Sequence, residues 1–235
     1  MSNKDRDKVM LAEHTLEVRY KPLGIFLDVR GYIADYIKQE QFFPHWSIDA
    51  NYVTFRDDPL KIVKDGAFIG FKSAGYVVFN PESRNYFLDK ATAFWKLLLR
   101  NQQYTLPDPI RFGARTKFFI PSSKKFDEIN KVMYEDIFAV NARTLFDGSE
   151  QDLMFTVILK EADFDVRIIG GPIHKNEASR YFQFSSSYFE KCGLFLDIDY
   201  YRTTGLSHKD VPQLLHTAVD LIWKKAERIA GGLGL

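Results

Sequence analysis

The feature that most constrains the fold is the order in which strand-like and helix-like stretches follow one another. His14–Tyr20 alternates apolar and polar residues, as a half-buried strand does. Isoleucine or valine then occupies every fourth position from Ile25 to Ile37, which predicts an amphipathic helix. Four more strand-like stretches and a helix that begins after Ser83 complete a βαββββα order. The four predicted strands are 46–55, 60–64, 67–72 and 76–80.

The same order begins again after YTLPDP (Tyr104–Pro109), where two prolines interrupt both helix and strand. A strand at 110–120 and a helix at 124–138 are predicted first. The last helix should start at the S-x-x-D capping box Ser207–Asp210 and carry an apolar stripe. The predicted strands between these two helices are 153–160, 164–169, 180–184 and 194–201.

These patterns predict an α+β protein, in which two βαββββα repeats form one curved antiparallel sheet with the helices on one face. The repeats would be residues 13–105 and 106–232. Residues 1–12 are expected to be a disordered N-terminal tail, and residues 233–235 a flexible C-terminus.

Composition excludes several classes of protein. The net charge of +1 leaves no electrostatic footprint for a nucleic-acid or membrane partner. Cys192 is the only cysteine, so no intramolecular disulfide can form, and a reducing compartment is indicated. No signal peptide or membrane-spanning run is visible, and we therefore predict a soluble, cytoplasmic protein.

The sequence resembles known proteins in two respects. The predicted βαββββα plan resembles the duplicated fold of the TATA-box-binding protein, in topology only. The motifs LEVRYKP, GARTKFFI and LDIDYY are similar to those of a sporadically distributed family of uncharacterised bacterial proteins. That family has no assigned activity to carry over, and its scattered occurrence implies an association with mobile or defence-related genes.

The stretch GLFLDIDYY raises the question of a functional site, because two aspartates interrupt an apolar run. Alternation along a strand puts Leu196 and Ile198 on one face, and Asp197 and Asp199 on the other. The same argument turns further charged residues toward the face that the helices leave open. This candidate binding face comprises Arg19, Arg111, Arg115, Lys117, Asp165, Arg167, Asp197 and Asp199.

Three interpretations of this face stay open from the sequence. It can be a solvated surface of cross-strand ion pairs, a surface that binds a partner, or a metal or acid–base site. Two carboxylates provide too few oxygens for a hard cation, so we predict no metal and no cofactor. We expect Arg115 and Arg167 to pair with the two aspartates. Replacing both aspartates by asparagine should then change stability by about 1 kcal/mol or less.

The sequence supports three hypotheses about function. We favour a non-catalytic protein-binding or regulatory scaffold, of the kind that belongs to a defence or toxin–antitoxin type system. A nucleic-acid-binding protein that uses the sheet face is the alternative, although the acidic residues there would repel phosphates. A small-molecule enzyme is the third, and Arg115, Arg167, Asp197 and Asp199 are its only candidate group. The common phosphate, esterase and zinc motifs are absent.

Overall fold

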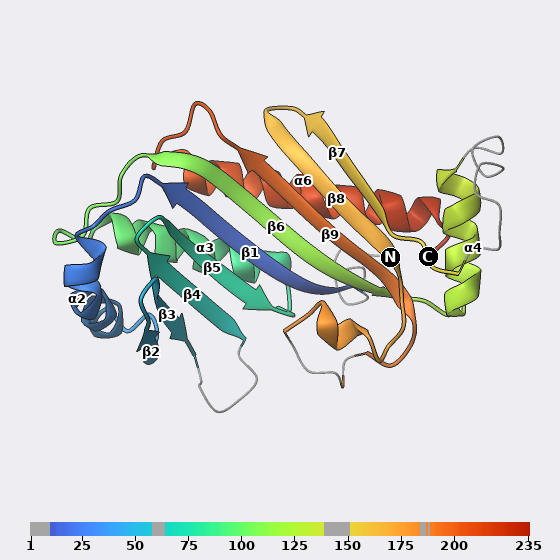
Figure 1. The fold of residues 1–235 in the computed structure, drawn as a ribbon, viewed down its shortest axis with the longest axis horizontal. Coiled ribbons are helices and arrows are strands. Elements are labelled where there is room, and N and C mark those ends of the chain that lie inside the picture. The colour runs from blue at the N-terminus through green and yellow to red at the C-terminus, as the bar shows by residue number, and fades with distance from the viewer. Residues whose placement is uncertain (1–9, 58–63, 139–150, 184–186, 188) are drawn as a thin grey trace.

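The computed structural model describes residues 10–57, 64–138, 151–183, 187 and 189–235 (Figure 1). The strands are β1 (Leu11–Tyr20), β2 (His45–Ile48), β3 (Tyr52–Arg56), β4 (Asp65–Gly70), β5 (Ser73–Phe79), β6 (Pro109–Pro121), β7 (Phe155–Glu161), β8 (Phe164–Ile173) and β9 (Gly193–Arg202). The α-helices are α2 (Phe26–Gln39), α3 (Arg84–Leu99), α4 (Phe126–Ile137) and α6 (Val211–Gly232). A short 3₁₀ helix spans Ala178–Arg180.

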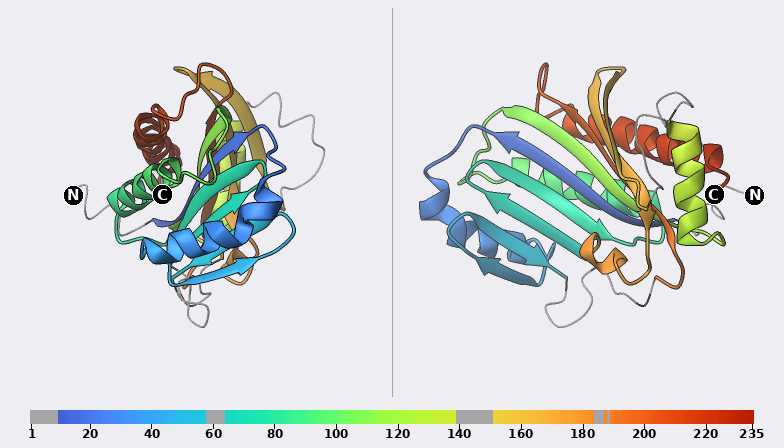
Figure 2. Two further views of the ribbon diagram at one scale, coloured as in Figure 1. Left: turned by 90° about the vertical axis from the view of Figure 1, so that its left-hand side faces the viewer. Right: turned by 45° about the vertical axis from the view of Figure 1, so that its right-hand side comes forward.

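All nine described strands form one antiparallel sheet in the order β2-β3-β4-β5-β1-β6-β9-β8-β7. The long strands β1 and β6 pair directly at its centre, so the two halves of the chain share one sheet. The helices pack on one face of this twisted sheet (Figure 2). The predicted α+β class with an antiparallel sheet is confirmed.

The main core lies between the sheet and the helices, and aromatic side chains fill much of it. Each strand contributes alternate residues, such as Leu16 and Val18 of β1, which are almost fully buried. Trp95 of α3 and Trp223 of α6 are also buried there and supply large apolar surfaces to the core. The helices therefore cover one face of the sheet and do not cover the other.

The first half differs from the prediction in its strand bounds. The stretch 46–55 is a hairpin of β2 and β3 because Asp49 closes a turn. Its Oδ1 accepts backbone hydrogen bonds from Asn51 at 2.6 Å and from Tyr52 at 2.8 Å. The strand predicted at 60–64 lies, except for Lys64, outside the described residues, so β4 and β5 complete the four strands between α2 and α3.

The second half has three described strands between α4 and α6, where four were predicted. The strand predicted at 180–184 is wrong in its described part, since Ala178–Arg180 is a 3₁₀ turn and Phe182 is buried in an aromatic cluster. The strand predicted at 164–169 is longer in the structure, because Gly170, Gly171 and Pro172 continue β8. An internal repeat stays a prediction.

Both ends of the chain also differ from expectation. Within the predicted disordered tail 1–12, Leu11 and Ala12 already belong to β1. At the other end α6 continues through Gly232, and the Leu233 side chain is buried. The Lys124 ammonium donates a hydrogen bond of 3.1 Å to the Leu233 carbonyl, which ties down the predicted flexible end.

Candidate binding face and the edge of the sheet

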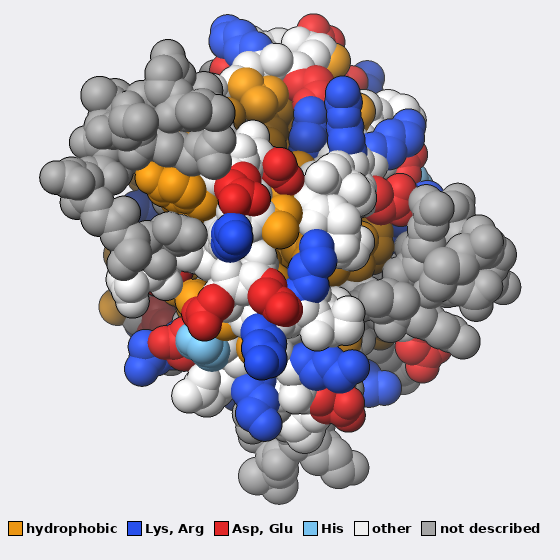
Figure 3. Space-filling model, turned by 90° about the vertical axis from the view of Figure 1, so that its right-hand side faces the viewer, with side chains coloured by type: hydrophobic (Ala, Val, Ile, Leu, Met, Phe, Trp, Pro, Cys, Tyr) orange, Lys and Arg blue, Asp and Glu red, His pale blue; other side chains and the backbone are white. Residues whose placement is uncertain are grey.

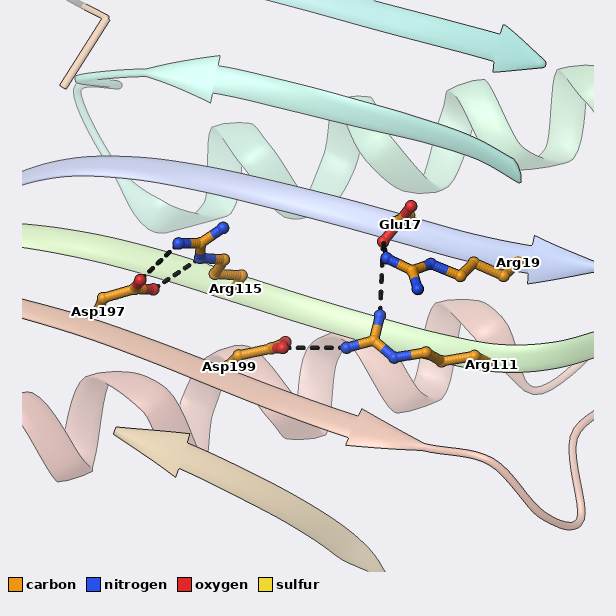
Figure 4. Close-up of polar contacts among 6 residues, drawn as sticks. All are labelled: Glu17, Arg19, Arg111, Arg115, Asp197 and Asp199. Atoms are coloured by element: carbon orange, nitrogen blue, oxygen red, sulfur yellow. Dashed lines mark hydrogen bonds and ion pairs between the residues drawn. The ribbon is translucent and has the colours of Figure 1, made fainter. Parts of the chain in front are cut away.

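Five residues of the candidate binding face lie on the side of the sheet opposite the helices (Figure 4), namely Arg19, Arg111, Arg115, Asp197 and Asp199. Alternation explains this, because Leu196 and Ile198 of β9 are fully buried on the helix side. The predicted face of Asp197 and Asp199 is therefore confirmed. What was not predicted is how completely these charges neutralise one another across β1, β6 and β9.

Arg115 of β6 and Asp197 of β9 form the closest pair. The guanidinium donates two hydrogen bonds to the carboxylate, one of them from Nε to Oδ1 at 2.7 Å. Such bidentate, charge-assisted pairs are stronger and more specific than single hydrogen bonds. The pairing with Arg115 was predicted, but the burial was not, because Asp197 is only 6% exposed. Asp197 is a structural carboxylate rather than a freely solvated one.

Arg111 lies between a carboxylate of β1 and a carboxylate of β9 (Figure 4). Its guanidinium is 3.4 Å from Glu17 of β1 and 3.0 Å from Asp199 of β9, and it stacks on the Tyr201 ring at 4.8 Å. Gly113 makes this position accessible, since a Cβ atom there would lie 2.7 Å from Arg111 Nη1. Arg19, also a candidate residue, donates to the same Glu17 carboxylate at 2.9 Å.

Burial sets the electrostatics of Asp199. Its desolvation raises the pKa of this carboxyl above the ordinary value, and Asp197 raises it further, while Arg111 and Arg115 act in the opposite direction. The ionised form of Asp199 is thus less favourable in the folded protein than in water. Arg115 shows the opposite effect, because its hydrogen bonds to Asp197 raise the pKa of the guanidinium.

Lys117 of β6 connects two segments that are far apart in the sequence. Its ammonium donates to Glu13 Oε1 at 2.7 Å and to the Tyr181 carbonyl at 3.0 Å. The second oxygen of Glu13 accepts a hydrogen bond from the Gln183 backbone at 3.0 Å. This pair, in which Glu13 is buried, therefore joins the central strands to the β8–β9 connection. That name is used here for the described residues 174–183, 187 and 189–192.

The β8–β9 connection covers part of the face that was predicted to be open. A second hydrophobic cluster forms beneath it, on the side of the sheet away from the helices. Phe119 and Phe195 of the sheet meet Phe182 and Phe189 of the connection, with ring centroids 4.9 Å apart for Phe119 and Phe189. The prediction of a wholly uncovered face is wrong at this end of the sheet.

The two remaining candidates lie on β8. Arg167 stands opposite Asp199 in the strand register, yet it is exposed and forms no ion pair in the part of the chain that the structure describes. The predicted pairing of Arg167 with an aspartate is wrong, because Arg111 reaches Asp199 instead. Asp165 is 3.8 Å from the exposed Lys160 ammonium, a distance typical of a weak surface pair.

The sequence predicted a strand at 153–160, but not that this strand, β7, would lie at the edge of the sheet. Its Ile158 side chain is 70% exposed and Val157 is 42% exposed. Ten large hydrophobic residues are exposed in the described part of the chain, and Ile137, Met154, Val157 and Ile158 gather around this one edge. Natural proteins normally protect sheet edges, so a seven-residue edge strand with four apolar residues is unusual.

A groove adjoins this edge on the helix side of the sheet. It has a volume of about 510 Å³ and lies between α4, α6 and the strands β7 and β8. Phe155 and Val157 form its strand wall, and Lys225 and Arg228 of α6 stand at its margin. Figure 3 views the end of the molecule that carries α4 and the C-terminus, where hydrophobic side chains are visible among charged ones.

The cations of β6 on the charged face are paired with carboxylates. Within the described ranges, no three His, Cys, Asp or Glu side chains come close enough to hold a metal ion. Each described cation of β6 that could bind a substrate anion already has a carboxylate partner.

None of the helices that the structure describes has the length and apolarity needed to cross a membrane.

Comparisons with known proteins add no identity. No protein-family model matches the chain, and no curated protein is similar to it in sequence.

Proposed function

We propose that this chain is a non-catalytic protein-binding subunit and that its binding surface is the β7 edge, defined as β7 with Met154 and the adjoining groove. The observation that carries this proposal is the exposure of Val157 and Ile158 on β7, whose outer side pairs with no strand in the part of the chain that the structure describes. A protein partner can add a strand to such an edge, gaining main-chain hydrogen bonds and burying the apolar side chains.

The charged face supports a protein partner over a nucleic acid. Phosphate binding requires free Lys and Arg side chains, whereas Arg111, Arg115 and Lys117 are each neutralised by an acidic neighbour. The carboxylates of Asp197 and Asp199 stand in the same array and would repel a phosphate backbone. A defence-related partner is one extension of this proposal, motivated by the sequence resemblance alone.

The test is affinity purification from the native host with three tagged forms of the chain. Ile158→Lys places a charge at the centre of the β7 edge. Ile110→Lys is the matched control, because Ile110 is a 47% exposed isoleucine at the start of β6, far along the sheet from β7. A partner that purifies with the unmodified chain and with the control, but not with Ile158→Lys, supports the proposal.

The identified partner is then titrated against the purified chain. We expect at least a tenfold weaker affinity for Ile158→Lys, with unchanged cooperative unfolding. Identical sets of associated proteins for all three forms would refute the assignment of the β7 edge. Salt-sensitive binding to duplex or single-stranded DNA, with no protein partner, would favour the nucleic-acid alternative.

A further inference from the structure

The pattern of side chains along β7 carries information about its partner. Within FTVILKE, the apolar residues occupy the middle and the charged residues, Lys160 and Glu161, occupy one end. A strand with this distribution can pair with a copy of itself in the antiparallel direction. Closed two-fold pairing is also the commonest symmetry of homo-oligomers.

We infer that the occupant of the β7 edge is a second copy of this chain, paired with β7 about a two-fold axis at Ile158; this rests on the proposed function of the edge. In this register the two Ile158 side chains face each other. On the helix side, Val157 of each copy stands opposite Leu159 of the other, so three central pairs are apolar.

The charged residues are compatible with this register. Lys160 stands opposite Thr156, and Glu161 stands opposite Phe155, so no like charges meet. A register centred on Leu159 would instead place Ile158 opposite Lys160 and Val157 opposite Glu161, which leaves charges against aliphatic side chains. Of these two registers, only the one centred on Ile158 keeps charged residues away from aliphatic side chains.

The groove beside β7 is consistent with a second copy. Val157, which lines it, is directed to the helix side together with Leu159, so a partner strand would bring its own Leu159 and Val157 to the margin of the groove. The opposite edge of the sheet does not offer this. There β2 has only four residues, a length typical of protected edges.

The mass of the purified chain in solution tests the inference first. Light scattering coupled to size exclusion should give twice 27.3 kDa for the unmodified chain and for Ile110→Lys. Ile158→Lys should give a single copy at the same concentrations, because two ammonium groups would then face each other across the axis.

A cross-link tests the register. In a Cys192→Ser background, Ile158→Cys should form an intermolecular disulfide on mild oxidation, since opposed residues of antiparallel strands have Cα atoms about 4.5–5.5 Å apart. Ile110→Cys in the same background is the control and should not cross-link. Circular dichroism and a melting curve establish that each variant is folded.

These experiments distinguish self-association through β7 from the binding of a different protein at the same edge. A monomer at every concentration, or a dimer that survives Ile158→Lys, overturns the inference. If that monomer still loses a different protein partner through Ile158→Lys, the proposed function stands without it. If neither self-association nor partner binding depends on Ile158, both are refuted.

Discussion

His14, at the centre of the sheet, should make the stability of this protein depend on pH. The residue is fully buried on β1, and its ring stacks on Phe87 at 5.0 Å between centroids. Its Nδ1 lies 2.9 Å from the Thr116 hydroxyl, while Nε2 has no hydrogen-bond partner among the described residues. Burial lowers the pKa of His14 from 6.5 to about 3, because an imidazolium would lose its hydration there.

Protonation of His14 favours the unfolded state. Between pH 6.5 and about pH 3, His14 is protonated in the unfolded chain but neutral in the folded protein. The free energy of unfolding therefore decreases as the pH falls through this window, by about 1.4 kcal/mol per pH unit. Between pH 6.5 and pH 5 the loss is about 2 kcal/mol, and by pH 3 it reaches about 5 kcal/mol. Such a loss is comparable to the whole stability of a typical domain.

Urea denaturation at pH 7 and at pH 5 measures this effect. His14→Asn removes the titrating group but keeps a polar atom near Thr116, and it should lower stability at pH 7 by about 1–3 kcal/mol. Between pH 7 and pH 5, the free energy of unfolding of His14→Asn should decrease by about 2 kcal/mol less than that of the unmodified protein. His216→Asn on the exposed surface of α6 is the control and should keep the full pH dependence. Equal slopes for the unmodified protein and His14→Asn would refute the argument.

Two predictions concern the ion pairs of β6. Asp197→Asn should destabilise the protein by about 1–3 kcal/mol, more than the sequence alone led us to expect, since it weakens a bidentate pair whose carboxylate is buried. Asp199→Asn should change stability by less than about 0.5 kcal/mol. The difference arises because burial raises the pKa of Asp199, so that its ionisation at neutral pH disfavours the folded state and a neutral asparagine costs little. Thermal melts of both variants check the order, and a larger loss for Asp199→Asn would contradict it. Gly113→Ala should displace the Arg111 guanidinium from Asp199. A double-mutant cycle between Arg111 and Asp199 should then show a coupling of about 0.5–1 kcal/mol with Gly113 and almost none in the Gly113→Ala background; equal coupling in both would contradict this role of Gly113.

Alternation was sufficient to predict which side chains turn away from the helices. It depends only on backbone geometry within one strand, so Asp197 and Asp199 were assigned to the correct face without knowledge of their neighbours. The same rule would have buried His14 with Leu16 and Val18, but the residue type concealed its position. A histidine counts as polar in a hydrophobic pattern, although its ring packs in a core when its charge is absent.

The sequence suggested Arg115 correctly but not the other ion pairs, because pairing across strands depends on register and on the length of the side chains. Arg115 stands opposite Asp199 in the register but extends diagonally to Asp197. Arg111 extends in the same direction, over Gly113, and thereby occupies the position expected for Arg167. These choices follow from the lengths of arginine side chains and from the absence of a Cβ at Gly113, neither of which a strand-by-strand pattern contains.

The β7 edge depends on a still longer-range property, the order of strands in the sheet. The stretch 153–160 was predicted to be a strand, and its apolar residues would be ordinary in the interior of a sheet. They become unusual only because β8 pairs with β9, and β9 with the central β6, which leaves β7 outermost. Exposure of Ile158 therefore follows from topology rather than from local sequence. If the edge were merely tolerated, replacing Ile158 by lysine would cost the folded chain nothing and change none of its associations; a loss of association at unchanged stability is the behaviour that distinguishes an interface from an unprotected edge.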